Sequence, residues 1–163
     1  MTFLARIEHA GRPCVGILEG DRIRLHAGTI FDPGAETGEE VAVADARWLT
    51  PTEPTKMVAL WNNFRAAAEK NGWAIPAEPL TFLKAPNSFA AHGQAIPAPK
   101  SYDGRVAYEG ELGIVIGKSC AGVSAAQAED HILGYTCVND VTAMELLQRD
   151  PSFRKAWYAV GFA

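Results

Sequence analysis

The sequence has few cysteines, and they follow none of the patterns by which cysteines carry structure. Cys14, Cys120 and Cys137 are the only three, they lie far apart, and no CxxC pair occurs. Zinc sites and disulfide frameworks both use cysteines at short or regular spacings. We therefore expect neither feature, and we expect three reduced thiols that are mostly buried.

Long apolar runs are also missing. A membrane-spanning helix requires about 18 or more consecutive apolar residues, and no such run occurs. The amino terminus, MTFLARIEHAGR, lacks the basic segment and apolar core of a secretory signal. These absences favour a soluble, cytoplasmic protein without a membrane partner.

Clusters of lysine and arginine are absent as well, and the formal net charge is -4. Nucleic-acid-binding proteins usually carry a basic patch, so we expect no nucleic-acid partner and favour a small-molecule ligand. With 163 residues, 48% hydrophobic and 21% charged, the composition is that of a globular protein.

The amino-terminal quarter reads as short strands. Residues 3–26 contain the segments FLARI, PCVGILEG and DRIRLH, with a turn at Glu19-Gly20-Asp21. Residues 27–55 are rich in glycine, proline and acidic residues, and we expect an irregular crossing there. The sequence predicts a small β meander over residues 1–50 and a second domain over residues 51–163.

The second domain mixes strands with short helices, which indicates an α+β, mostly β fold. Asn63 is a candidate N-cap and Gly72 a stop signal for the first helix, and Ser124 with Gln127 forms a capping-box pattern for the second. Strands are expected in KMVALW, LTFLK, VAYEGELGIVIGK and LGYTCVND, and helices in NNFRAAAEKNG, VSAAQAEDHI and VTAMELLQRD.

Two glutamates stand at the start of the apolar strand AYEGELGIVIGK. Alternate side chains of a strand share a face, so Glu109 and Glu111 are neighbours. Beyond Gly113 both faces are apolar, and we expect the strand to be buried on both sides. Like charges in a poorly solvated place require a shared proton, a basic partner or a metal ion. The alternative is an ordinary strand end with solvated acids.

Asp140 supplies a third carboxylate, directly after the segment LGYTCV. It could converge with the two glutamates, or Asn139 or Asp140 could cap a helix that begins near Val141. Three oxygen ligands suit magnesium, manganese or calcium, whereas zinc and copper prefer nitrogen and sulfur.

Four segments together resemble the fumarylacetoacetate hydrolase family, in the branch of the 2-hydroxyhepta-2,4-diene-1,7-dioate isomerases. They are YEGELGIVIGK, VSAAQAEDHILGYTCVNDVTA, LWNNF and FLKAPNS, within residues 56–150. The resemblance implies a mixed β-sandwich roll as the catalytic domain. It also implies Glu109, Glu111 and Asp140 as ligands of magnesium or manganese, with calcium as an alternative.

The activity implied by the resemblance is that of a metal-dependent hydrolase, decarboxylase or isomerase. Its substrate would be a small 2-oxo or 2-hydroxy-dienoic acid, processed through a metal-stabilised enolate. Gln148 resembles the family's substrate-facing glutamine, although one residue further along, and could equally be a solvated helix-end residue. Arg65 could bind a substrate carboxylate or be an exposed helix arginine. We expect a homodimer.

The sequence also departs from the family pattern. No histidine lies between His26 and His92, where members carry a catalytic one, and Arg65 and Glu69 occupy that segment. The general base is therefore unidentified. In AVGFA, Val160 replaces the expected lysine and Ala163 the expected aspartate, and we expect a truncated core. These departures favour an alternative function: a catalytically silent relative that binds metal and ligand or serves as an interaction subunit.

Overall fold

The structure is a computed structural model that describes residues 1–97, 100–149 and 161–162, without the side chains of residues 147–149 and 161–162. The chain divides into two compact units. Unit 1 contains Met1–Glu53, Ala90–Ala95 and Gly110–Val138, and unit 2 contains Pro54–Phe89, Ile96–Glu109 and Asn139–Ala163.

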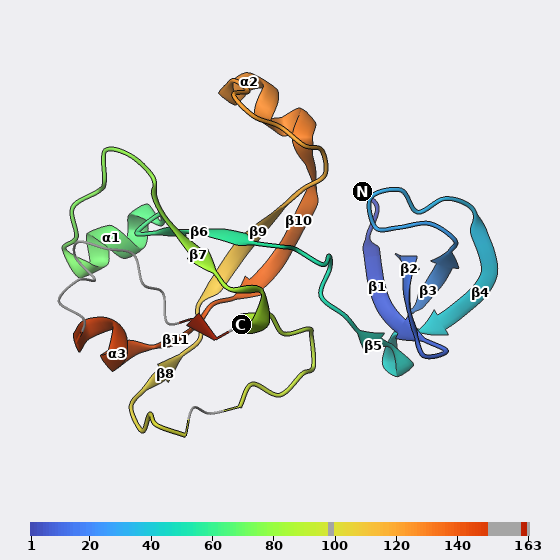
Figure 1. The fold of residues 1–163 in the computed structure, drawn as a ribbon, viewed down its shortest axis with the longest axis horizontal. Coiled ribbons are helices and arrows are strands. Elements are labelled where there is room, and N and C mark those ends of the chain that lie inside the picture. Colours follow the sequence, from blue (N-terminus) through green and yellow to red (C-terminus); the bar gives the residue numbers. More distant parts are fainter. Residues whose placement is uncertain (98–99, 150–160, 163) are drawn as a thin grey trace. The chain divides into compact units, whose positions relative to one another are not determined.

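Unit 1 contains an antiparallel five-stranded sheet with the strand order β4-β3-β2-β1-β5 (Figure 1). The first three strands confirm the predicted meander, and Gly20 takes the positive φ of 62° that its turn requires. The irregular crossing expected over residues 27–55 is wrong in part, because β4 and β5 lie within it. The strands are β1 (Leu4–His9), β2 (Arg12–Glu19), β3 (Arg22–His26), β4 (Glu36–Ala42) and β5 (Arg47–Trp48).

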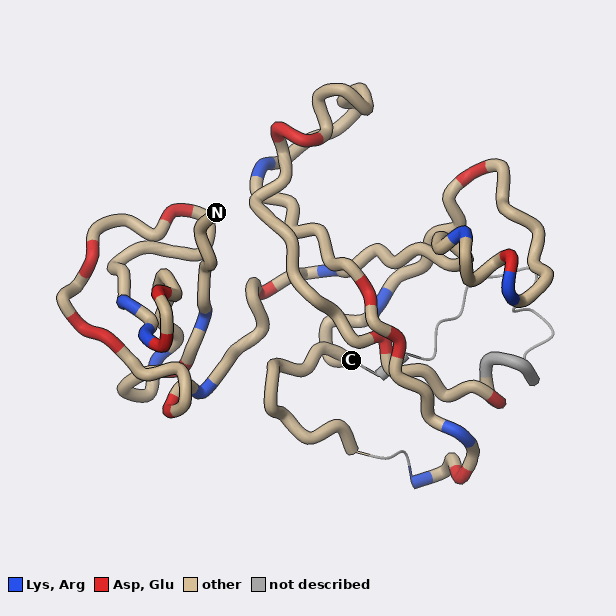
Figure 2. The backbone as a smooth tube through the Cα atoms, turned by 180° about the vertical axis from the view of Figure 1, so that it is seen from behind, with Lys and Arg blue, Asp and Glu red and all other residues tan. Residues whose placement is uncertain are grey.

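The core of this sheet consists of alternate side chains on its strands. Ile7, Ile23 and Leu25 are fully buried, and Cys14 packs with them. Cys120 and Cys137 are exposed, so the expectation that the thiols are mostly buried is wrong for two of the three. Figure 2 shows acidic and basic positions interspersed along the sheet, as expected for a surface with scattered ion pairs, each worth little in stability.

Unit 1 also contains the pair of β9 (Gly110–Ile116) and β10 (Ile132–Asn139). The short helix α2 (Ala125–Ala128) and the 3₁₀ turn η3 (Glu129–His131) precede β10. The predicted capping box at the start of α2 is confirmed, because Ser124 N–H donates to Gln127 Oε1 at 3.2 Å.

Unit 2 contains the antiparallel pair β6 (Met57–Trp61) and β7 (Leu80–Lys84), with α1 (Arg65–Asn71) between them in sequence. The predicted stop of α1 is confirmed, since Gly72 is left-handed with φ of 66°. The predicted cap at Asn63 is wrong: Phe64 is the N-cap residue and its side chain makes no capping hydrogen bond. No helix in the described part of the chain is long and apolar enough to cross a membrane.

The remaining strands of unit 2 form a sheet in the order β12-β11-β8. They are β8 (Val106–Ala107), β11 (Val141–Ala143) and β12 (Gly161–Phe162), and α3 (Met144–Arg149) follows β11. The helix expected from residue 141 therefore begins only at Met144. The α+β, mostly β class is confirmed.

Candidate metal centre

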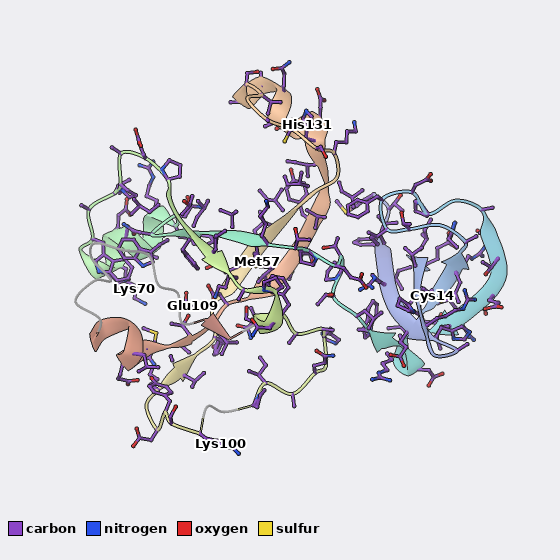
Figure 3. The ribbon with its side chains drawn as sticks, in the orientation of Figure 1. Cys14, Met57, Lys70, Lys100, Glu109 and His131 are labelled. Carbon is purple, nitrogen blue, oxygen red and sulfur yellow. The ribbon has the colours of Figure 1, made fainter. Side chains whose placement is uncertain are left out.

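Glu109 and Glu111 lie on either side of the start of β9 (Figure 3, which labels Glu109). Both are partly buried, whereas Tyr108 and Gly110 are exposed. This alternation agrees with the prediction that the two glutamates share a face.

Burial of β9 on both sides is wrong. The face opposite the glutamates is apolar but exposed, with Leu112 at 63%, Ile114 at 53% and Ile116 at 55% of full exposure. Residues 113 and 115, on the glutamate face, are partly buried. Although the residues of β9 after Glu111 are apolar, the described part of the chain does not cover both faces of this strand.

Asp140 lies between β10 and β11 and is tied to Glu109 through the backbone. Its N–H donates to the Glu109 carbonyl at 2.8 Å, and the Glu109 N–H donates to Asn139 Oδ1 at 3.1 Å. The helix-capping alternative for Asn139 or Asp140 is wrong, because Val141 begins a strand. Asn139 instead helps to fix the backbone of Glu109.

Lys84, at the end of β7, forms an ion pair with Asp140 and is a residue that the sequence analysis missed. Its Nζ donates to Asp140 Oδ1, and the two side chains are 6% and 15% exposed. Nζ also lies 5.7 Å from the centre of the Phe82 ring. Lysine is almost never this buried unless it is paired. The sequence feature that could have indicated Lys84 is its position as the last residue of the apolar strand LTFLK.

The donor chemistry of the predicted ligands fits a hard divalent cation. Glu109, Glu111 and Asp140 offer carboxylate oxygens, which magnesium, manganese and calcium prefer, and the backbone joins Glu109 to Asp140. Among the residues that the structure describes, however, no three acidic, histidine or cysteine side chains converge closely enough to hold an ion. Binding by all three carboxylates therefore stays a prediction.

The two predicted substrate-binding residues lie on different helices. Arg65 is the first residue of α1 and is exposed, as is Glu69 one turn later. Gln148 is on α3, and its side chain lies outside the described residues. Val160 and Ala163, which replace the family's lysine and aspartate, are also outside the described residues.

A second polar network fixes the first turn of α3. The Tyr102 hydroxyl donates to Glu145 Oε2, and the Arg105 N–H donates to the same oxygen at 2.8 Å. These hydrogen bonds, above all the one from Tyr102, lower the pKa of the Glu145 carboxyl. A Cβ on Gly104 would lie 2.5 Å from Glu145 Oε2, so the loop before β8 packs closely against this carboxylate.

Comparison with known proteins gives two matches that follow one another along the chain. Residues 56–162 match the fumarylacetoacetate (FAA) hydrolase C-terminal family, and residues 4–51 match the Rv2993c-like N-terminal family.

Curated relatives extend over most of this chain. The oxaloacetate tautomerase YisK of Bacillus subtilis is 32% identical over 84% of this chain and 48% of its own length. A 4-hydroxyphenylacetate degradation bifunctional isomerase/decarboxylase of Salmonella dublin is 36% identical over 82% of this chain and 32% of its own length. The chain thus spans about half, or less, of the length of these two relatives.

A solved structure gives the same relationship at the level of the fold. The 2-hydroxyhepta-2,4-diene-1,7-dioate isomerase of Mycobacterium marinum superposes with a TM-score of 0.78 at 32% identity, over 98% of this chain and 62% of that chain. Since the family match covers about two thirds of the sequence, the chain belongs to the fumarylacetoacetate hydrolase family.

Proposed function

We propose that this chain is part of a divalent-metal-dependent enzyme that acts on a small 2-oxo or 2-hydroxy-dienoic acid. The observation that carries the proposal is the backbone hydrogen bond from the Asp140 N–H to the Glu109 carbonyl. It links two half-buried carboxylate residues within the region that matches the family. The names of the relatives support the substrate class, since they describe a tautomerase and an isomerase/decarboxylase.

In this proposal the chain's own residues bind and orient. Glu109, Glu111 and Asp140 would hold magnesium or manganese, with calcium as an alternative. The bound ion would supply a Lewis acid that stabilises negative charge on the 2-oxo oxygen of the substrate. Arg65 and Gln148 remain the proposed contacts to the far end of the substrate, and the reaction would be isomerisation, decarboxylation or hydrolysis through an enolate.

A second candidate function is that of a catalytically silent relative. The segment that follows β6 favours this function. A histidine was expected there, but the segment contains none, and Arg65 and Glu69 in it are exposed. Such a chain would bind the ion and an oxo acid without transferring a proton.

Thermal unfolding in the presence of magnesium or manganese tests the metal site. An ion at about 100 times its dissociation constant that binds only the folded state adds about 2.7 kcal/mol of stability. Glu111→Gln should abolish this shift, whereas Glu78→Gln, at an exposed residue outside the proposed site, should leave it intact. An unchanged melting temperature in the wild-type chain would remove the metal-dependent proposal.

Turnover separates the two candidate functions. The chain is incubated with oxaloacetate and with a 2-hydroxy-dienoic acid, and tautomerisation and loss of the diene are followed by ultraviolet absorbance. Metal-dependent conversion of either compound supports the enzyme. A metal-induced shift in melting temperature without conversion supports the silent relative.

Three further expectations stay proposals. They are the division into residues 1–50 and 51–163, the homodimer and the cytoplasmic location. The two family matches, over residues 4–51 and 56–162, support the first of these.

A further inference from the structure

The amino-terminal sheet of unit 1 carries a cavity that the proposed function does not use. The cavity has a volume of about 270 Å³ and is lined mainly by the beginning of β2, the end of β3 and the beginning of β4. Pockets for drug-sized ligands measure about 300–1,000 Å³, so this cavity suits a smaller molecule.

One part of the lining is apolar. Cys14, which Figure 3 labels, and Leu25 both line the cavity and both belong to the buried core of the sheet. Removal of apolar surface from water is favourable. These two side chains therefore offer a surface on which a hydrocarbon group can pack.

Another part of the lining carries one charge of each sign. Arg12 and Glu39 both line the cavity and are exposed, but they form no ion pair with each other in the described structure. Within the described part of the chain, Arg12 is also the one arginine of this sheet without an ion pair. The other four, Arg6, Arg22, Arg24 and Arg47, each pair with a glutamate. The two charges of the cavity are thus held apart, as expected for a ligand that bridges them.

His26 adds a hydrogen-bond acceptor to the lining. Its Nδ1 lies 2.9 Å from the Gly34 carbonyl oxygen. Because a carbonyl oxygen only accepts, Nδ1 carries the proton and Nε2 carries the lone pair. Nε2 is buried and has no hydrogen-bond partner among the described residues. An unsatisfied buried acceptor is unfavourable, so a ligand with an N–H donor would supply a bond that the free chain lacks.

We propose that this cavity binds an α-amino acid with an apolar side chain. The carboxylate of the ligand would pair with Arg12 and its ammonium group with Glu39, and its side chain would pack on Cys14 and Leu25. A zwitterion matches a lining with one charge of each sign, whereas a plain anion or cation would be attracted by one side chain and repelled by the other. The site shares no residue with the proposed metal centre, and the inference does not depend on the proposed function.

The test is isothermal titration calorimetry of the full 163-residue chain with L-leucine and two analogues. One analogue, 4-methylpentanoic acid, lacks the ammonium group, and the other, 3-methylbutylamine, lacks the carboxylate. Leucine should bind, and each analogue should bind at least about tenfold more weakly because it loses a charge-assisted hydrogen bond. Binding of either analogue as tightly as leucine would overturn the proposal, since recognition would then need only one of the two charges.

Variants locate the binding to this cavity. Arg12→Gln and Glu39→Gln should each lower leucine affinity at least about tenfold. Arg22→Gln and Glu40→Gln, at an exposed ion pair of the same sheet outside the cavity lining, are the matched controls and should leave leucine affinity unchanged. Absence of leucine binding by the wild-type chain, or an unchanged affinity in Arg12→Gln or Glu39→Gln, would overturn the proposal.

Discussion

The strength of the Lys84–Asp140 pair can be measured with a double-mutant cycle in the absence of metal. Asp140→Asn replaces the carboxylate by a neutral amide and leaves the ammonium of Lys84, 6% exposed, without a counter-charge. Removal of one partner of a buried pair costs about 3–5 kcal/mol. Since Asp140 is 15% exposed and water can reach part of the site, we expect the lower end, about 3 kcal/mol.

The other two variants complete the cycle. Lys84→Met leaves the more exposed partner unpaired, and we expect a smaller loss, about 2 kcal/mol. The double variant removes both charges and fills the space with an apolar side chain, so its loss should not exceed about 2 kcal/mol. The single losses then sum to about 5 kcal/mol, and the coupling energy is about 3 kcal/mol, at the upper end for residues in contact.

Urea unfolding followed by tryptophan fluorescence provides the assay. Two of the four tryptophans, Trp61 and Trp73, lie in unit 2 with ring centres 5.5 Å apart, so part of the emission reports on the unit that contains the pair. Lys70→Met, at an exposed lysine on α1, should change stability by no more than about 0.5 kcal/mol. Additive losses in the double variant would refute the ion pair as a buried, coupled interaction.

Two further predictions concern other parts of the fold. Gly113→Ala should destabilise the β9–β10 pair by about 1–3 kcal/mol, because its Cβ would lie 2.8 and 2.9 Å from side chains of β10. Gly110→Ala, with nothing within 4 Å, should be close to neutral, and both are measured by urea unfolding followed by circular dichroism. Tyr102→Phe should be destabilising near neutral pH, and the difference from wild type should shrink in acid. The sign follows because the pKa of Glu145 is below its ordinary value of 4.5 in the folded chain, so its stabilisation is present above that pH and is lost as the carboxyl is protonated. A pH-independent difference would contradict the role of Glu145.

The sequence was sufficient to predict a strand where the local residue pattern and the tertiary environment favour the same structure. Strands β1 and β3 have buried residues at alternate positions, and the turn between β2 and β3 contains Gly20 with a positive φ. Strand β4, ETGEEVA, could not be predicted in this way because its first five residues are exposed. Its conformation depends on pairing with β3, which local sequence does not reveal.

Tertiary context also explains the misplaced start of α3. Residues 141–150 contain the helix formers Met144, Glu145 and Leu146, and helix propensity favours extending the helix back to Val141. Instead Thr142 pairs with Ala107 on β8, and Val141 pairs with Phe162 on β12. Pairing on both sides overrides a preference worth less than about 1 kcal/mol per residue.

The sequence indicated the acidic residues of the candidate site, whose role as ligands stays a prediction, and did not indicate Lys84. Glu109 and Glu111 are recognisable because charge interrupts an apolar strand, and Asp140 because it follows another strand. Lys84 is 56 residues away from Asp140 in sequence, and no local pattern connects them. Pairs at such separations become visible only when the strands that carry them are placed.

The buried lysine changes how the acidic residues of this site should be interpreted. Like charges in a poorly solvated place can be balanced by a basic side chain or by a metal ion, and Lys84 already supplies the first kind of cation to Asp140. One ammonium balances one carboxylate, whereas Glu109, directly before β9, and Glu111, on β9, carry two more negative charges. If all three carboxylates converge, the site retains a charge of about -2 after pairing with Lys84, which is the charge that one divalent cation neutralises. The ion pair between Lys84 and Asp140 is therefore compatible with the proposed metal site.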